Sequence, residues 1–309
     1  MRIGIITTLD AAIPLIQFTY VNGLKPFVFT GISNYPESLQ KIEAFCTYSK
    51  INYVAEINKD ALYNWIKSID ADIIIVMGYA KKITLSKFKL PGKGIYNIHF
   101  GKLPQYRGAA PLFWQIKNNE PYIGMAIHIL TDEVDEGDIV WETTIKNELH
   151  YNYTYLQQLL GNLAVNGFAF IMQTLLQTGN VISRPQGSGS LNYLHAPGIK
   201  DIFIKWNEMP AATIINLTRA CNKWHTGAIA LLNNNWEVRI ADAAISSNAD
   251  NNKVTPGTVT GLHDYYIKVA CINNEELHIY SLTINGVFMP VRFAQQFGLQ
   301  PGFQFKSTF

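Results

Sequence analysis

Residues 72–77 read Asp-Ile-Ile-Ile-Val-Met, a short run dominated by β-branched apolar residues that predicts a buried strand. Four similar runs predict further strands, at residues 3–6, 27–30, 53–55 and 95–99. The segments between them carry apolar residues at helical spacing, at residues 11–20, 37–49 and 59–69. This alternation predicts an α/β fold, a Rossmann-like, mostly parallel sheet with helices on both faces. Ligands of such sheets bind at the carboxyl ends of the strands, which directs attention to the residues after 77 and 99.

The second half of the chain predicts a smaller, β-rich domain. A long apolar helical pattern over residues 154–176 ends at Gly179, and residues 181–199 then turn to Ser, Gly, Asn and Pro. Short β-rich runs with intervening glycines follow, at residues 228–232, 236–241, 257–260, 266–270, 276–282 and 303–306. We therefore predict an α/β domain over residues 1–185, a linker over residues 186–203 and a barrel-like (OB-like) domain over residues 204–309.

The composition is that of a globular protein without a strong bias in charge. Among 309 residues, 25 Lys+Arg face 23 Asp+Glu, and the net charge of +2 gives no general attraction to phosphate backbones. Cys46, Cys221 and Cys271 form no C-x-x-C pair, so we expect buried thiols in a cytoplasmic protein. No stretch approaches ~20 apolar residues, and we expect neither a membrane partner nor a metal. Residues 7–10 lack glycine, which argues against a dinucleotide site of the G-x-G-x-x-G type.

Two polar segments carry the residues suited to chemistry. Residues 97–111 read Asn-Ile-His-Phe-Gly-Lys-Leu-Pro-Gln-Tyr-Arg-Gly-Ala-Ala-Pro, and residues 131–138 read Thr-Asp-Glu-Val-Asp-Glu-Gly-Asp. Asn97 and His99 are two apart at a strand end, so their side chains leave the same face, and Asp135 lies on a loop between later strands. An amide, an imidazole and a carboxylate at one sheet edge suit acyl transfer. Taken singly, each has a structural reading as a satisfied histidine, a strand-end asparagine or a solvated charge.

The Asn-x-His pair, the Leu-Pro-Gln-Tyr-Arg-Gly-Ala-Ala-Pro string and the Asp-x-Gly-Asp loop together resemble the 10-formyltetrahydrofolate-dependent formyltransferases. The string is most similar to that of methionyl-tRNA formyltransferases, and sugar-nucleotide N-formyltransferases share the two-domain plan. Residues 1–185 match the catalytic domain, with a weaker match through residues 204–207 and 218–224. The resemblance implies a folate-dependent one-carbon transferase that takes N10-formyltetrahydrofolate as co-substrate and needs no metal.

The resemblance also implies a role for each residue of the site. Asn97 would donate to the formyl oxygen, His99 as an imidazolium would stabilise that oxygen and take part in proton transfer, and Asp135 would orient His99. The residues implied for the pterin pocket are Gly78, Tyr79, Ile83, Leu103, Pro104, Glu133, Val134 and Gly137. Tyr79 and Ile83 have an equal reading as core packing, and Gly78-Tyr79-Ala80 replaces the Ala-Tyr-Gly that is usual in the tRNA enzymes.

Three further residues are weaker candidates for substrate binding, namely Thr8, Asp10 and Arg107. Arg107 would pair with an acidic group of a ligand or, with equal weight, brace the acidic loop near Asp138. His128 lies on the strand that faces the same loop, and we interpret it as structural.

The amine that accepts the formyl group is predicted from departures from the tRNA enzymes. Their basic loop after the second strand is replaced by residues 31–38, which are short and contain no Lys or Arg. Residues 201–309 hold 8 Lys+Arg and 8 Asp+Glu, without the basic excess that RNA binding favours. We therefore favour a small primary amine, such as a nucleotide-linked amino sugar. The alternatives are a methionyl-tRNA formyltransferase and a non-catalytic folate-binding scaffold, and a homodimer is a further expectation.

Overall fold

The structure is a computed structural model that describes residues 1–187, 193–221, 227–233, 235–246 and 254–308. The chain divides into two compact units. The first unit comprises Met1–Pro111, Tyr122–Ile145 and Leu156–Leu194, and the second comprises Leu112–Pro121, Lys146–Tyr155 and His195–Phe309. The domain and linker boundaries expected at residues 185 and 203 stay a prediction, and residues 188–192 of the expected linker lie outside the described residues.

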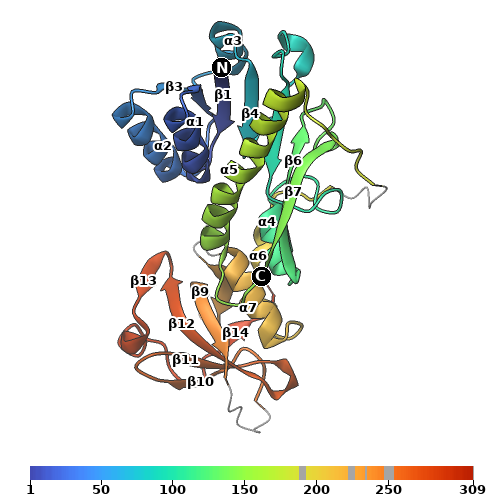
Figure 1. The fold of residues 1–309 in the computed structure, drawn as a ribbon. Coiled ribbons are helices and arrows are strands. Elements are labelled where there is room, and N and C mark those ends of the chain that lie inside the picture. Colours follow the sequence, from blue (N-terminus) through green and yellow to red (C-terminus); the bar gives the residue numbers. More distant parts are fainter. Residues whose placement is uncertain (188–192, 222–226, 234, 247–253, 309) are drawn as a thin grey trace. The chain divides into compact units, whose positions relative to one another are not determined.

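The first unit is built on a seven-stranded sheet in the order β3-β2-β1-β4-β5-β6-β7 (Figure 1). Its strands are β1 (Arg2–Thr7), β2 (Lys25–Thr30), β3 (Asn52–Ala55), β4 (Ile73–Met77), β5 (Ile95–His99), β6 (Tyr122–Ile129) and β7 (Ile139–Lys146). The first five strands pair in parallel, and β6 pairs antiparallel with β5. The mostly parallel sheet expected from the alternating pattern is confirmed.

Helices cover both faces of this sheet. They are α1 (Ile13–Val21), α2 (Pro36–Tyr48), α3 (Ala61–Ile69) and α5 (Tyr153–Thr178), with short 3-10 turns at Asp10–Ala12 and Leu85–Lys87. On one face, Trp65 and Ile66 of α3 are buried in a cluster with Val76 of β4 and Ile95 of β5. On the other face, Gly167 of α5 packs against Ile127 of β6. Asn97 and His99 share the face of Ile95, because side chains alternate along a strand.

Helix α5 departs from the expectation that no segment of the chain has the length and apolar character of a membrane span. By length and composition alone, this helix could cross a membrane. Half of its most apolar segment is buried inside the protein. Core helices of globular domains have the same length and apolar character.

The second unit contains an antiparallel sheet in the order β10-β11-β12-β9-β8-β14, with β13 added on β12. Its strands are β8 (Ala228–Leu232), β9 (Glu237–Ile245), β10 (Val259–Leu262), β11 (Ile267–Ala270), β12 (Glu276–Ile284), β13 (Val287–Met289) and β14 (Phe305–Lys306). Its helices are α4 (Pro111–Lys117), α6 (Ile199–Ile202) and α7 (Ala211–Cys221), with 3-10 turns at Ile272–Asn274 and Val291–Phe293.

The sheet of the second unit curls so that its two ends meet. The N–H of Val259 donates to the carbonyl of Phe303 at 2.7 Å, and the N–H of Phe305 donates to the carbonyl of Gly257 at 2.8 Å. These bonds join the β10 end of the sheet to the β14 end. The sheet therefore closes, and closure removes the free edges that these two strands would otherwise have. The expected barrel-like domain is confirmed, and Trp206, fully buried and stacked on Phe305, forms part of its core.

Candidate active site

Strands β5 and β6 position three polar side chains on one face of the sheet. Asn97 and His99 alternate with Ile98 on β5, and the antiparallel register pairs Asn97 directly with His128 on β6. Cross-strand neighbours of this kind lie close enough for their side chains to bond. The Asn97 amide nitrogen lies 3.0 Å from Nε2 of His128. His128, which the sequence analysis interprets as structural, is therefore part of the cluster.

The loop between β6 and β7 brings Asp135 to this cluster. Asp135 has a φ of 53°, in the left-handed region, and Gly137 follows so closely against β6 that a Cβ there would lie 1.8 Å from the Ile129 carbonyl oxygen. Position 137 thus requires glycine. The Asp135 carboxylate accepts from the N–H of Gly108 at 2.9 Å, and its Oδ2 lies 3.5 Å from Nδ1 of His99. The structure brings the three residues predicted to be catalytic together.

Asn97 has two polar partners within the protein. Its amide nitrogen donates to Asp135 Oδ1 at 3.2 Å and meets His128 Nε2 at 3.0 Å. The other ring nitrogen of His128 donates to the Ile129 carbonyl at 2.9 Å, and Nε2 also lies 3.3 Å from Asp135 Oδ1, so Nε2 faces both Asn97 and Asp135. In this arrangement Asn97 holds Asp135, and its donation to a formyl oxygen stays a prediction.

The electrostatics of His99 also differ from the expectation of a stable imidazolium. His99 is 6% exposed, and this burial lowers its pKa more strongly than the attraction of Asp135 raises it. The positive charge of His128, when present, lowers the pKa of His99 further, while the bond of Nε2 to the Tyr106 carbonyl, at 2.6 Å, raises it. The net direction is downward, so a neutral ring is favoured.

Asp135 has the opposite balance. Burial alone would raise the pKa of its carboxyl, yet His99, His128 and the N–H of Gly108 together hold that pKa well below its usual range. Asp135 is accordingly an ionised carboxylate that is 9% exposed and surrounded by hydrogen-bond donors. A neutral imidazole beside a fixed anion is suited to accept a proton, because the anion stabilises the charge that the ring then acquires.

The two loops expected to hold the pterin ring lie next to each other. The N–H of Leu85, after β4, donates to Asp132 Oδ1 at 3.1 Å, which joins the segment after Gly78 to the loop that bears Glu133 and Val134. Gly78 has a φ of 67°, and Val134 is 47% exposed. Exposed backbone and one apolar side chain fit a flat heterocycle, so these residues are compatible with a folate. Their role as ligands stays a prediction.

Other residues expected in the pterin pocket have partners within the protein. Ile83 belongs to the core cluster around α3, and Leu103 to a smaller cluster with Ala126 and Ile139. Tyr79 donates its hydroxyl to the buried Glu56 at 3.2 Å. Pro104 is buried after a cis peptide bond. Core packing, the alternative reading for Tyr79 and Ile83, describes both residues, because Tyr79 packs against the cluster that contains Ile83.

The three weaker candidates for substrate binding are also engaged by neighbouring groups. Thr8 donates its hydroxyl to the Gly78 carbonyl. Asp10 is 4% exposed and is held by Lys41 at 3.0 Å and by Gln158 at 3.2 Å. Arg107 binds protein groups of the acidic loop region rather than open solvent, which matches the bracing alternative more closely than contact with a ligand.

Gln186 is a contact of the site that the sequence analysis missed. Its amide nitrogen donates to the carbonyl oxygens of Asp135 and Gly137 at 2.8 and 2.7 Å. The composition around it, with Pro185 and Gly187, is typical of a linker, so no local signal distinguishes it.

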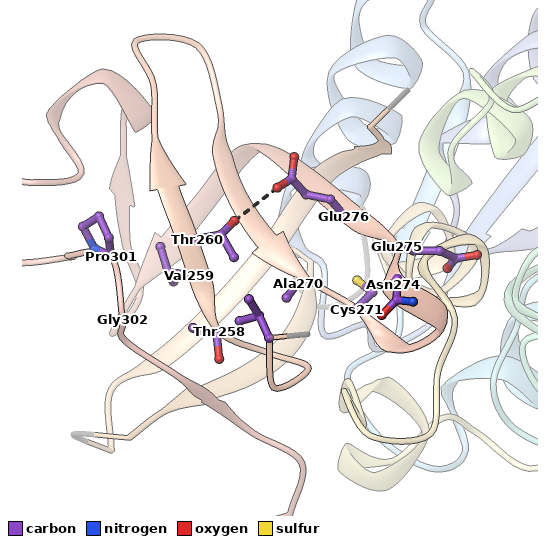
Figure 2. Close-up of a pocket in the computed structure, with 11 residues that line it drawn as sticks. Thr258, Val259, Thr260, Ala270, Cys271, Asn274, Glu275, Glu276, Pro301 and Gly302 are labelled. Carbon is purple, nitrogen blue, oxygen red and sulfur yellow. Dashed lines mark hydrogen bonds between the residues drawn. The ribbon is translucent and has the colours of Figure 1, made fainter. Parts of the chain in front are cut away.

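A pocket of about 340 Å³ lies in the second unit and is lined by none of these residues (Figure 2). Figure 2 shows Thr260 donating to Glu276 across its wall, at 3.2 Å. Glu276 is further paired with Lys268 and His278 at 3.2 and 3.1 Å, so its charge is already compensated. Within the described part of the chain, no group of three or more His, Cys, Asp or Glu side chains is arranged to hold a metal ion.

Comparison with known proteins agrees with the geometry of the first unit and with the form of the second. The family description "Formyl transferase" matches residues 38–168, and "Formyl transferase, C-terminal domain" matches residues 199–292. The chain belongs to the formyl transferase family. Members of this family are enzymes that use formyl-tetrahydrofolate.

Among relatives in the formyl transferase family, the methionyl-tRNA formyltransferase of Ruminiclostridium cellulolyticum is 29% identical over 227 residues, which cover 72% of this chain and 70% of that protein. The crystal structure of WlaRD, described as a sugar 3N-formyl transferase, has a TM-score of 0.69 at 19% identity and covers 93% of this chain and 98% of WlaRD. HypX from Aquifex aeolicus has a TM-score of 0.68 at 17% identity and covers 96% of this chain. The chain spans about half of HypX, 48% of its length.

Proposed function

We propose that this chain transfers a formyl group from N10-formyltetrahydrofolate to a primary amine. The observation that carries the proposal is the convergence of Asn97, His99 and Asp135 in one buried network, with 3.5 Å between Nδ1 of His99 and Oδ2 of Asp135. Bound N10-formyltetrahydrofolate would supply an activated formyl carbon next to His99. The exposed backbone of Gly78 and of the loop at Glu133 and Val134 is the proposed support for its pterin ring.

In this proposal His99 acts as a general base and then as a general acid. Burial favours its neutral form, and since Nε2 is bonded to the Tyr106 carbonyl, Nδ1 is the atom that would take the proton that the amine loses when its nitrogen attacks the formyl carbon. The bond from the formyl carbon to N10 of the folate would then break, and N10 would take up that proton as tetrahydrofolate leaves. Asp135, ionised throughout, stabilises the imidazolium that results. Asn97 holds the carboxylate in place through the N–H that it donates to Asp135 Oδ1.

The proposed acceptor is a small amine, such as a nucleotide-linked amino sugar. The segment between β2 and α2 supports it, because residues 31–35 form a short connection without Lys or Arg. The N–H of Ile32 in this connection bonds to the buried Glu56 at 3.3 Å, which ties it back onto the sheet. A short connection held against the sheet offers no basic arm for a nucleic-acid stem.

A methionyl-tRNA is the second candidate acceptor. It is favoured by the curated relatives, since the methionyl-tRNA formyltransferase of R. cellulolyticum matches at 29% identity over most of both chains. The cytoplasmic location and the homodimer stay predictions, and they do not depend on which acceptor is correct.

The decisive experiment gives the purified chain N10-formyltetrahydrofolate with two acceptors in parallel, a panel of nucleotide-linked amino sugars and charged initiator tRNA. We expect release of tetrahydrofolate and a formylated sugar, with no formyl-methionine above background. Formylation of the tRNA alone would replace the favoured acceptor by the second. Absence of turnover with both acceptors, with folate still bound, would favour the scaffold alternative, and His99→Ala serves as the inactive control.

A further inference from the structure

One side-chain amide, that of Gln186, joins the two loops that surround Asp135. Its Oε1 accepts from Nε and Nη2 of Arg107 at 3.0 and 2.7 Å. Its Nε2 donates to the carbonyl oxygens of Asp135 and Gly137 at 2.8 and 2.7 Å. A side-chain amide has two donors and one oxygen with two lone pairs, so Gln186 uses its full hydrogen-bonding capacity here. Another orientation of the same side chain would break at least some of these bonds.

Each of the two loops contributes a direct contact to the charged pair. In the first loop, the Tyr106 carbonyl accepts from His99 and the Gly108 N–H donates to Asp135. The second loop bears Asp135 itself. Because Arg107 lies between the two contact residues of the first loop, the bonds from Gln186 to Arg107 and to Asp135 fix the separation of the loops.

The backbone at Asp135 depends on outside contacts of this kind. A φ of 53° is disfavoured for a residue with a side chain, so the loop needs partners that make this conformation the best one available. Gly137 supplies close packing against β6 on one side, and Gln186 supplies two hydrogen bonds to the carbonyl groups on the other.

The position of Gln186 is set by backbone hydrogen bonds of a neighbouring residue. Arg184, two residues earlier, exchanges two backbone hydrogen bonds with Ile139 of β7, at 2.8 and 2.9 Å. The Arg184 side chain, by contrast, pairs with Glu142 at the exposed surface. The same short segment therefore carries one residue directed to the site and one directed to solvent.

We propose that Gln186 is a positioning residue for the formyl transfer proposed above, and that it acts by holding the Asp135 loop against the Arg107 loop so that the carboxylate faces His99. The proposal rests on the proposed function for its kinetic consequence, while its geometric content concerns the Asp135–His99 contact alone. Gln186 bonds to the backbone of Asp135 and Gly137 and to the side chain of Arg107, so its effect on the carboxylate passes through the loops that it joins.

The test compares Gln186→Glu, Gln186→Ala and the matched control Arg184→Ala in the full chain. Glutamate keeps the size and the acceptor for Arg107, but it places an anion against two carbonyl oxygens that formerly accepted N–H groups. With the amine found by the formylation assay, we expect both Gln186 variants to lower kcat about 10-fold or more, because misplaced catalytic groups cost that much, with little change in the KM for the folate. Arg184→Ala should keep the wild-type kcat.

A second readout measures the contact without any substrate. The NMR titration of His99 is recorded with and without Asp135→Asn, in the wild-type and in the Gln186→Glu background, as a double-mutant cycle. We expect Asp135→Asn to shift the pKa of His99 in the wild type and to shift it clearly less when Gln186 is replaced. A wild-type chain without formyltransferase activity that still showed this pattern would end the proposed function but not the positioning role.

Other outcomes would overturn the positioning role. These are a kcat of Gln186→Glu within about twofold of the wild type, a rise in KM alone, or an unchanged coupling between Asp135 and His99. Loss of the folded state in both Gln186 variants, seen by circular dichroism, would make Gln186 a residue of the fold and would equally overturn it.

Discussion

At the scale of single residues, the site depends on the environment that burial creates for His99. Both ring nitrogens face oxygen acceptors, the Tyr106 carbonyl and the Asp135 carboxylate, yet desolvation still lowers the pKa of the ring. A general base works best when its pKa lies near the working pH, because the ring is then largely free of its proton and still basic enough to take one up. The neutral ring and the fixed anion therefore divide the work between proton transfer and charge stabilisation.

Asp135→Asn tests this division. The substitution keeps the shape of the side chain and removes the negative charge, so a protonated His99 loses its compensation. We expect a fall in kcat of about 100-fold or more, since general acid–base assistance is of that size. Steady-state kinetics with N10-formyltetrahydrofolate measure it, and Asp70→Asn, at an exposed position directly after α3, is the control that should stay near the wild type. Equal rates in the two variants would contradict the role of the charge.

The lowered pKa of His99 predicts a dependence of stability on pH. When the pKa of a histidine is lower in the folded protein than in the unfolded protein, the unfolded chain takes up the proton at a higher pH. Between these two pKa values, lowering the pH therefore favours unfolding. The free energy of unfolding should therefore fall as the pH drops below about 6.5, the ordinary value for histidine, until the folded pKa is reached. Asp135, with its lowered pKa, keeps its stabilising contribution in that range and loses it only below about pH 4.

Denaturant unfolding at pH 7.5 and at pH 5.5 measures this effect. His99→Gln lacks the titrating ring, so its stability should fall less between the two pH values than that of the wild type. If both proteins lost the same stability, another group would be responsible for the pH dependence.

At the scale of elements, helix α5 is held against the turn that follows β1. A Cβ at Gly161 would lie 2.3 Å from the Ala11 carbonyl oxygen, which is backbone and has no rotamer to change. Close approach of this kind lets α5 cover the sheet face opposite to Asn97 and His99. The support of the strand face below the site thus depends on a position without a side chain.

Gly161→Ala should destabilise the first unit even though alanine is the better helix former. Overpacking against rigid backbone typically costs about 1–3 kcal/mol, which exceeds the helix-propensity gain of about 1 kcal/mol. Asn166→Ala, on an exposed position of the same helix, is the matched control and should be neutral or slightly stabilising. Urea denaturation of the two variants compares them directly, and a Gly161→Ala protein as stable as the control would show that the helix can shift at little cost.

At the scale of the whole molecule, the second unit is built from three separate segments of the chain, and the last of them begins at His195. Residues 112–121 and 146–155 belong to that unit, although their neighbours in sequence belong to the first. Arg219 of α7, 7% exposed, holds the later of these segments: its guanidinium donates to the carbonyl groups of Tyr151 and Glu148, each at 2.8 Å, and to the side chain of Asn147.

Arg219→Met should strongly destabilise the second unit. The methionine keeps much of the length of the side chain, but it leaves several buried oxygen acceptors without donors, at about 1–3 kcal/mol for each. Burial lowers the pKa of Arg219, yet the group stays charged, so the loss of its donors dominates. Thermal unfolding measures the effect against Lys205→Met, a substitution at a half-exposed surface position paired with Glu208. Equal melting temperatures would mean that water replaces the lost donors.

The sequence by itself determined the sheet of the first unit, because apolar runs such as residues 72–77 and 95–99 record burial on both faces of a parallel strand. It also determined that Asn97, His99 and Asp135 belong together, through the spacing of two polar segments. Only the tertiary structure decided that His128 stands opposite Asn97, since strand register depends on pairing between distant segments. The same holds for Gln186 and for the lowered pKa of His99: hydrogen bonds across 51 residues of chain, and the desolvation of a ring, depend on what folding brings around a residue and not on its neighbours in sequence.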